Sequence, residues 1–473
     1  MKPSNALADD RLKSKGSGRR IGLLSPYSGG NLGNTAILAA MIANTRVRIP
    51  GVEIVGITLA PEDTRRRLGI QTFPLAGVSR PYYTLISEAT GNGPHAEGRS
   101  FGQIREWAKR IPLFRGFVRS VRTCVAELAH IVKAARFIRT LDQVVVTGGG
   151  ALDESWGGPW GHPWSLLKWS VISRFSKIPL LFVSVGKSFL ERPLSRLFVR
   201  GALSLAAYRS YRDLETKVAI QTLIDASNDP VYPDLAFSYP CESLQASEFR
   251  GSGDGRLVVG VSPIAYCDPR VWPEKHEERY ATYVRQLAEM VQWLIRENCR
   301  VLMFTTDSPD MTTVQDVLAQ ISRGGSDTDA VQVLPGSTDL DVESFLKKIS
   351  HVDLTIASRL HGVILSHLNA TPVLALSFDP KVDAHMSAMQ QSGYCLSIDR
   401  FQVAILIDRF NALKAARERE RAHLRSTAVR FRQLLNLQYD KLLGAVQTSP
   451  CLVAGQTRFD DFSPLPIGDL STK

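Results

Sequence analysis

The fold is decided by residues 21–59, which read IGLLSPYSGGNLGNTAILAAMIANTRVRIPGVEIVGITL. Residues 21–24 form a short apolar run that is typical of a buried strand, and residues 52–59 form a second one. Between them, a glycine-rich loop over residues 25–34 leads into a helix rich in Ala and Ile at residues 35–44. A strand, a glycine-rich loop, a helix and a strand in this order predict the start of a doubly wound α/β domain.

The same alternation continues on both sides of one break. The break is a polar stretch over residues 241–256 that ends in glycines, the composition of a linker. Before it we expect strands at residues 143–147, 180–185 and 203–208, with helices at 164–176 and about 213–224. After it we expect strands at 257–262, 301–305, 331–334, 354–357 and 372–377, with helices at 280–297, 312–322, 342–349 and 361–369. Such alternation implies parallel sheets with right-handed crossovers.

The fold class expected from this pattern is α/β, with two Rossmann-like, doubly wound domains facing one another across a cleft, in a GT-B-like arrangement. The expected order is a disordered N-terminus at residues 1–20, an N-terminal Rossmann-like domain at 21–240, a linker at 241–256, a C-terminal Rossmann-like domain at 257–404, a bracing helix at 405–448 and a tail at 449–473. Ligands of such sheets bind outside the carboxyl ends of the strands. The functional residues should therefore come from loops that follow strands.

Composition excludes several classes of protein. Hydrophobic residues make up 44% of the chain and charged residues 22%, as in a globular protein with a core. No apolar run is long enough for a transmembrane helix, and the polar, basic N-terminus does not resemble a signal peptide, so we expect a cytoplasmic protein. The six cysteines are scattered without metal-ligand spacing, which predicts neither a metal site nor a disulfide framework.

The net charge of +11 indicates an acidic partner. No nucleic-acid-binding motif is present, which leaves small anionic substrates or an anionic membrane surface. Residues 103–140 carry nine Lys and Arg against two Glu, with apolar residues at helical spacing. This amphipathic helix either packs on its own domain or makes a peripheral contact with the inner face of the membrane.

Two glycine-rich turns follow predicted strands and could present backbone N–H groups to a ligand. The first contains Asn31 and Asn34, and the second contains Gly149 and Gly150. A helix N-terminus after such a turn favours anions. Neither turn is a complete dinucleotide-binding or Walker motif, and each could serve only as a tight turn.

Charged residues follow two further elements of the first half. Arg209 and Arg212 lie in the turn between a predicted strand and a predicted helix, and an arginine fork suits a carboxylate or phosphate. The alternative is that these arginines pair with neighbouring carboxylates on the surface. Asp234 lies in a Pro-Asp turn, where an aspartate usually caps the turn.

The most specific motif is Ala357-Ser358-Arg359-Leu360-His361-Gly362, between a buried strand and a helix. Arg359 can hold an anion, and His361 can exchange a proton near neutral pH. Lys381 follows the next strand, so basic groups converge on neighbouring strand ends.

In this order, the motifs resemble those of the polysaccharide pyruvyl transferase family. That family has an early Gly-Asn-x-Gly-Asp loop, a Gly-Gly-Gly turn, an arginine turn, a Pro-Asp-x-Ala-Phe segment, Ser-Arg-x-His-Gly and a lysine after the next strand. The resemblance runs from about Gly22 to Lys381. Asn34 stands where the family has aspartate, and either Arg209 or Arg212 could take the place of the family arginine.

The resemblance implies transfer of a pyruvyl group from phosphoenolpyruvate to a sugar of a surface or extracellular polysaccharide, forming a ketal without a metal or other cofactor. It implies that Arg209 or Arg212, Arg359 and Lys381 hold the donor, that His361 is the acid and that Asp234 assists as a base. The acceptor is a sugar or a lipid-linked oligosaccharide. Two alternatives remain. One is a GT-B glycosyltransferase that uses a sugar nucleotide. The other is a non-catalytic member of a polysaccharide assembly complex, which is favoured by Asn34 in place of the family aspartate. The acceptor sugar, the linkage and the oligomeric state are left open by the sequence.

Overall fold

The computed structural model of the protein describes residues 18–26, 29–77, 112–155, 157–240, 255–272, 274–324 and 330–443. The expected N-terminal segment before residue 18, residues 241–254 of the expected linker and the expected tail from residue 449 lie outside the described residues.

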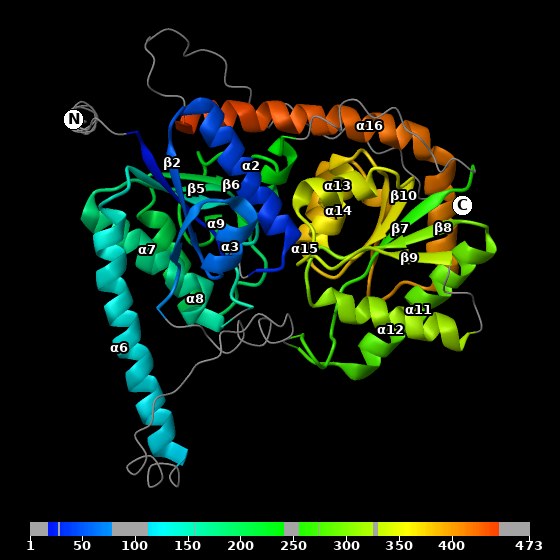
Figure 1. The fold of residues 1–473 in the computed structure, drawn as a ribbon, viewed down its shortest axis with the longest axis horizontal. Coiled ribbons are helices and arrows are strands. Elements are labelled where there is room, and N and C mark those ends of the chain that lie inside the picture. Colours follow the sequence, from blue (N-terminus) through cyan, green and yellow to red (C-terminus); the bar gives the residue numbers. More distant parts are fainter. Residues whose placement is uncertain are drawn as a thin grey trace.

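The first half of the chain forms a six-stranded parallel sheet in the order β3-β2-β1-β4-β5-β6 (Figure 1). Its strands are β1 (Arg20–Leu24), β2 (Glu53–Thr58), β3 (Gln71–Pro74), β4 (Gln143–Thr147), β5 (Leu180–Val185) and β6 (Tyr208–Tyr211). The connecting helices are α2 (Leu32–Arg48), α3 (Pro61–Leu68), α6 (Pro112–Ile138), α7 (His162–Ser176), α8 (Pro193–Ser204) and α9 (Leu214–Gln221). The short helix η2 (Leu235–Ser238) ends this half.

The second half repeats the topology in the order β12-β11-β10-β7-β8-β9, again with all strands parallel. Its strands are β7 (Val258–Ser262), β8 (Arg300–Met303), β9 (Val331–Val333), β10 (Leu354–Ala357), β11 (Val373–Ser377) and β12 (Cys395–Ser397). Its helices are α11 (Glu277–Arg296), α12 (Asp310–Arg323), α13 (Val342–Ile349), α14 (Leu360–Leu368) and α15 (Pro380–Ala388). In each half, the first strand lies beside the fourth, which is the strand order of a Rossmann fold.

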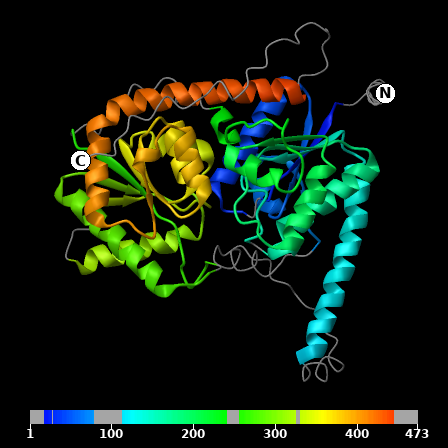
Figure 2. The same cartoon turned by 180° about the vertical axis from the view of Figure 1, so that it is seen from behind.

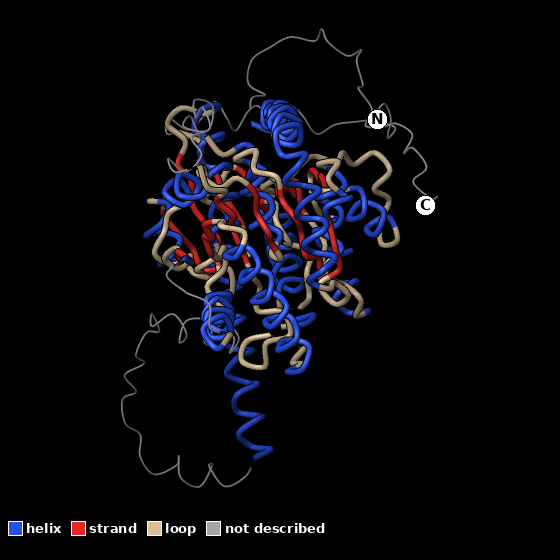
Figure 3. Tube along the Cα trace, turned by 90° about the vertical axis from the view of Figure 1, so that its right-hand side faces the viewer, coloured by secondary structure: helices blue, strands red, loops and turns tan. Residues whose placement is uncertain are grey.

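Three apolar clusters hold these layers together. Two of them fill the space between one sheet and its helices, one cluster in each half. The third joins the halves, because it contains residues of α2, α14 and the last helix, α16 (Val403–Leu443). Figures 1 and 2 show α16 running along both halves, and Figure 3 shows the strands enclosed by helices.

Polar contacts fasten the end of α16 to the first half. The Gln438 side chain is fully buried, donating to Ser210 Oγ at 2.7 Å and accepting from Ser184 Oγ at 3.1 Å. Tyr439 Oη lies 2.9 Å from Ser238 Oγ. Buried polar groups are costly unless paired, so these contacts define one position of the helix on the first sheet.

Some predicted elements were wrong. Residues 203–208 are not a strand, because α8 continues to Ser204 and β6 begins only at Tyr208. The short apolar run there belongs partly to the end of a helix. The periodicity of apolar residues does not by itself distinguish a buried strand from a buried helix segment over so few residues. The edge strands β3 and β12 were not predicted, since they span four and three residues and lack an apolar pattern. None of the helices within the described ranges is long and apolar enough to span a membrane.

Candidate active site

The predicted motifs gather where the carboxyl ends of the two sheets approach each other. The strand order reverses between β1 and β4 in one sheet and between β7 and β10 in the other. Loops diverge at such switch points, and ligands bind in the crevice between them. The glycine-rich loop follows β1, residues 148–150 follow β4, and Arg359 and His361 follow β10.

The glycine-rich loop makes one of the contacts between the halves. The Gly30 carbonyl oxygen accepts hydrogen bonds from Ser308 N at 3.1 Å, Ser308 Oγ at 3.1 Å and Ser337 Oγ at 2.6 Å. Leu32 N donates to the Thr306 carbonyl at 2.9 Å. These backbone groups of the loop are therefore satisfied by the second half of the chain.

Asn31 and Asn34 support the start of α2. Asn31 Oδ1 accepts a hydrogen bond from Asn34 N at 2.9 Å and caps the helix. Asn34 Oδ1 would lie 3.3 Å from a Cβ atom at Gly149, whose φ of +65° favours glycine. Gly150 borders open space, since nothing lies within 4 Å of its Cβ position. Ligand contacts of these four residues stay a prediction.

His361 packs directly on the first turn of α2. A Cβ atom at Gly33 would lie 1.9 Å from Cγ of His361, so only glycine permits this approach. The imidazole Nε2 is buried and has no hydrogen-bond partner among the described residues. Burial lowers the pKa of His361 to about 4; the cationic side chains of Arg212, Lys381 and Arg359 add to this effect, and Asp234 opposes it. The imidazole is therefore neutral at pH 7, with one nitrogen available to a ligand.

Arg212 is the arginine that reaches this crevice. Its Nη1 lies 3.4 Å from Asp234 Oδ2, and its Nε lies 3.4 Å from Asp213 Oδ2. Its Nη2 is buried without a partner among the described residues and lies 2.5 Å from the Cβ position of Gly186. Asp234 Oδ1 also accepts from Ala236 N at 3.0 Å and caps η2, as expected for a Pro-Asp turn.

Arg209, the other candidate, is held away from the crevice. Its Nε and Nη2 bind the Asp229 carboxylate at 2.7 and 3.1 Å, and its Nη1 donates to the Leu203 carbonyl at 3.1 Å. Leu203 belongs to the end of α8, which precedes the amino end of β6. The structure therefore brings Arg212, and not Arg209, to the other site residues.

Two carboxylates grip Arg359. Its Nε and Nη2 bind the oxygens of Asp310 at 2.5 and 2.7 Å, and its Nη1 lies 3.0 Å from Asp307 Oδ2. Burial raises the pKa of Asp307 to about 6; Arg359 opposes this increase, whereas the neighbouring charge of Asp310 adds to it. Asp307 thus shares the Arg359 guanidinium with Asp310.

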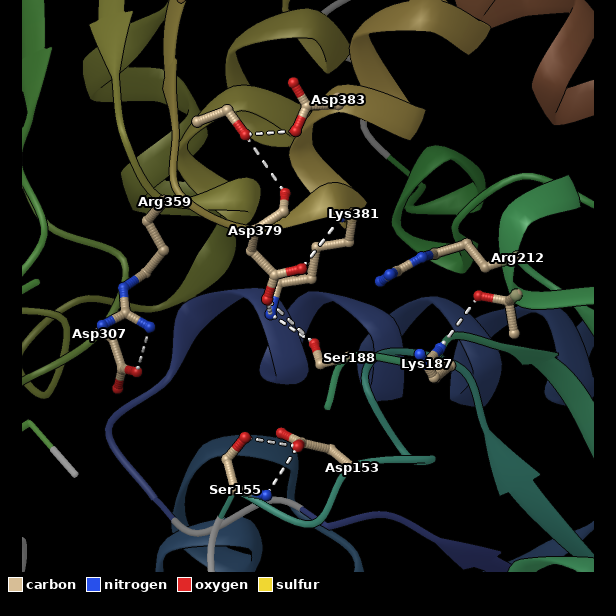
Figure 4. A network of polar contacts seen from close by, with 12 residues as sticks. Asp153, Ser155, Lys187, Ser188, Arg212, Asp307, Arg359, Asp379, Lys381 and Asp383 are labelled. Carbon is tan, nitrogen blue, oxygen red and sulfur yellow. Dashed lines mark hydrogen bonds and ion pairs between the residues drawn. The ribbon is translucent and has the colours of Figure 1, made fainter. Parts of the chain in front are cut away.

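Lys381 extends from the second half to the first (Figure 4). Its Nζ lies 2.8 Å from Asp379 Oδ2 and 2.9 Å from Ser188 Oγ, which follows β5. Burial opposes ionisation of Asp379, but the contacts with Lys381 and Ser188 hold its pKa below the usual value. Figure 4 shows the Arg212 guanidinium directed towards this pair. In the part of the chain that the structure describes, no cluster of His, Cys, Asp and Glu is suited to a metal ion.

The sequence analysis missed Ser188, Asp307, Asp310 and Asp379. All four follow strands, because Ser188 comes after β5, Asp307 and Asp310 after β8, and Asp379 after β11. The rule that functional residues follow strands could have found them if it had been applied to every strand end. Their polar partners could not have been assigned from sequence, because the contacts join segments far apart in the chain.

Comparisons with known structures define the class of fold. UDP-bound MnaA from S. aureus superposes with a TM-score of 0.52 and 11% identity over 91% of this chain and 99% of its own. The UDP-GlcNAc 2-epimerase from Neisseria meningitidis, bound to UDP-GlcNAc, superposes with a TM-score of 0.52 and 9% identity, covering 90% of this chain and 99% of its own. A glycosyltransferase from Rickettsia africae superposes with a TM-score of 0.50 and 10% identity, covering 91% of this chain and 100% of its own. The protein thus has the GT-B-like fold expected from its sequence.

The sequence also matches a known family. The family profile described as polysaccharide pyruvyl transferase matches residues 31–380, more than half of the 473-residue chain. No curated protein matches the chain. The chain belongs to the polysaccharide pyruvyl transferase family, which confirms the resemblance seen in its motifs and indicates a transferase.

The contact of Gly33 with His361 makes the first prediction. In Gly33→Ala the new methyl group would overlap the imidazole, so we expect a loss of stability of about 1–3 kcal/mol, as in overpacked cores. Gly150→Ala, which adds a methyl group in open space, should leave the thermal unfolding midpoint unchanged. Equal midpoints for the two variants would contradict the close contact.

Proposed function

We propose that the protein transfers the pyruvyl group of phosphoenolpyruvate to two hydroxyls of a polysaccharide sugar, forming a ketal and releasing phosphate. The observation that carries this proposal is the pair of buried nitrogens without described partners, Arg212 Nη2 and His361 Nε2, in one crevice with Arg359 and Lys381. Buried N–H groups need acceptors, and an anion with several oxygens would supply them. Membership of the family supports the same reaction.

The donor carries a carboxylate and a phosphate, which require separate cationic partners. The Arg212 fork suits one of them. The Lys381 ammonium can bind the other if the anion takes over from Asp379 and Ser188. The charge of Arg359 is balanced by Asp307 and Asp310. Its guanidinium would attract the anionic donor, and the two carboxylates ensure that it is not a buried unpaired cation before the donor binds.

The reaction begins with a proton at the methylene carbon of the donor. His361 is neutral at pH 7 before the donor binds. A bound phosphate dianion would favour the protonated imidazole, so binding of the donor would itself generate the general acid. Protonation leaves an oxocarbenium-like carbon, which the first sugar hydroxyl attacks. Phosphate then leaves with the C–O bond electrons, and the second hydroxyl closes the ketal. One hydroxyl proton restores His361 through the candidate base Asp234, and the other departs with phosphate.

The test is an assay of phosphate release and product mass with phosphoenolpyruvate and a panel of bacterial glycans. His361→Ala should lower turnover by about 10²–10⁴-fold, the usual loss of a general acid, and should weaken donor binding far less, as measured by calorimetry. A near-normal rate would exclude His361 as the acid. Consumption of a nucleotide sugar instead of phosphoenolpyruvate would favour the glycosyltransferase alternative, and donor binding without turnover on any glycan would favour the non-catalytic one.

Arg212 and Arg209 provide a matched pair for the donor site. Arg212→Lys keeps the charge but loses the fork, and we expect phosphoenolpyruvate to bind at least about tenfold more weakly. Arg209→Lys changes a residue held by Asp229 and should leave the dissociation constant unchanged. Calorimetry measures both, and the reverse result would assign the donor to Arg209.

Helix α6 supports a proposed place of action at the inner face of the membrane. Its contacts with α7 include Lys168 Nζ bound to Glu127 Oε1 at 2.8 Å. A separate stripe stays exposed, with Val125, Leu128 and Val132 at 60%, 62% and 51% accessibility. Figures 1 and 2 show α6 extending away from the rest of the molecule. Lys and Arg occur before and after the stripe, at 115, 119, 122, 133 and 136, so two copies would repel, whereas an anionic lipid surface would attract the helix.

The lipid contact is tested by co-sedimentation. The protein should sediment with phosphatidylglycerol vesicles at low salt, remain in solution with phosphatidylcholine, and be released at high salt. The triple variant Val125→Ser, Leu128→Ser, Val132→Ser should lose sedimentation without a change in circular dichroism. Equal behaviour with both lipids, or a dimer that the triple variant dissociates, would contradict the proposal.

A further inference from the structure

Three aromatic side chains lie beside the candidate active site, and we call them the aromatic trio. The ring centroids of Tyr266 and Trp272 are 5.7 Å apart, and each lies 5.5 Å from that of Phe378. All three are only partly buried. Tyr266 and Trp272 follow β7, and Phe378 follows β11, so the trio lies at the carboxyl edge of the second sheet.

The trio adjoins both cations of the second half. Ala265 N donates to Asp310 Oδ1 at 3.0 Å, and Asp310 holds Arg359, so the residue before Tyr266 contacts the partner of one cation. Phe378 precedes Asp379 in the chain, and the Lys381 ammonium lies 5.9 Å from its ring centroid. A ligand on these rings would therefore lie next to the proposed donor.

Tyr266, alone among the three rings, also lines an open cavity of about 420 Å³, and Trp272 and Phe378 lie beside that ring rather than in the lining. Its polar lining includes His276, Glu278, Arg279, Gln286, Asp399 and Arg400. Two cations and two carboxylates balance in this lining, which suits a neutral polar ligand better than a phosphate. The Tyr266 hydroxyl bonds to both oxygens of Asp399, at 3.2 and 3.1 Å, and this contact fixes the ring at the edge of the cavity.

We propose that the aromatic trio and this cavity form the subsite for a pyranose ring of the acceptor. The assignment rests on the proposed pyruvyl transfer, for which it names the place of the second substrate. A pyranose has an apolar C–H face and a rim of hydroxyls. Partly exposed rings would cover the C–H face, and the adjoining side chains would hydrogen-bond to the hydroxyls.

The backbone around Tyr266 supports this assignment. Cys267 has a φ of +60°, which is rare for a residue other than glycine. Strained backbone of this kind is often retained where it sets a functional side chain. Cys267 directly follows Tyr266 and precedes Trp272, so its backbone sets the course of the chain between two members of the trio.

The experiment is saturation-transfer NMR with methyl glycosides of galactose, mannose, glucose and N-acetylglucosamine. We expect transfer to at least one glycoside in the wild type, its loss in Trp272→Ala, and its recovery in Trp272→Phe, which keeps an aromatic face. Trp293→Ala is the matched control, since Trp293 on α11 is also partly buried but packs against Phe410 of α16. Once an acceptor is identified, its KM should rise at least about tenfold in Trp272→Ala, with the phosphoenolpyruvate dissociation constant unchanged.

Calorimetry with phosphoenolpyruvate on the same proteins separates the two proposals. If the wild type does not bind phosphoenolpyruvate but a glycoside binds through Trp272, the proposed pyruvyl transfer is contradicted and the proposed sugar subsite is supported. If phosphoenolpyruvate binds but no glycoside does, or glycoside binding survives Trp272→Ala, the subsite is overturned. Binding of UDP in place of the glycosides, abolished by Trp272→Ala, would assign the cavity to a nucleotide and also overturn it.

Discussion

The approach of the Gly33 backbone to the His361 ring is the constraint on which the rest of the site depends. The second half can place its histidine against the first half only because residue 33 has no side chain. The neighbouring Gly30 carbonyl accepts three hydrogen bonds from the same half, so the position is held by polar contacts as well as by shape. Because the ring is buried by this contact, its pKa falls, and the chemistry open to His361 follows from the packing.

The charges of the crevice follow a single pattern. Arg359 and Lys381 are each bound to carboxylates, and Arg212 lies between Asp213 and Asp234 at longer distances of 3.4 Å. Buried cations are destabilising if they are unpaired, so the carboxylates offset the cost of burying these three cations. Arg212 is the least tightly paired of the three, and its Nη2 has no hydrogen-bond partner among the residues that the structure describes.

Much of the fold could be predicted from the sequence, because strands buried in a parallel sheet appear in the sequence as continuous runs of apolar residues. Residues 143–147, 180–185 and 354–357 were predicted with the observed bounds. The edge strands β3 and β12 were not, since their burial is incomplete and their pattern weak. At the site, the strand ends pointed to His361, Arg359 and Lys381, but the sequence pattern did not separate Arg209 from Arg212. Both follow the same sequence pattern, and only the partner Asp229 shows that Arg209 is engaged elsewhere.

Helix α16 limits how the protein can move. It has 41 residues, about 60 Å at the rise of an α-helix, and its buried side chains contact both halves. A wide hinge opening would have to bend this helix or strip Gln438 and Tyr439 from the first sheet. Relative motion of the two sheets is therefore limited to movements that leave this helix and its buried contacts intact.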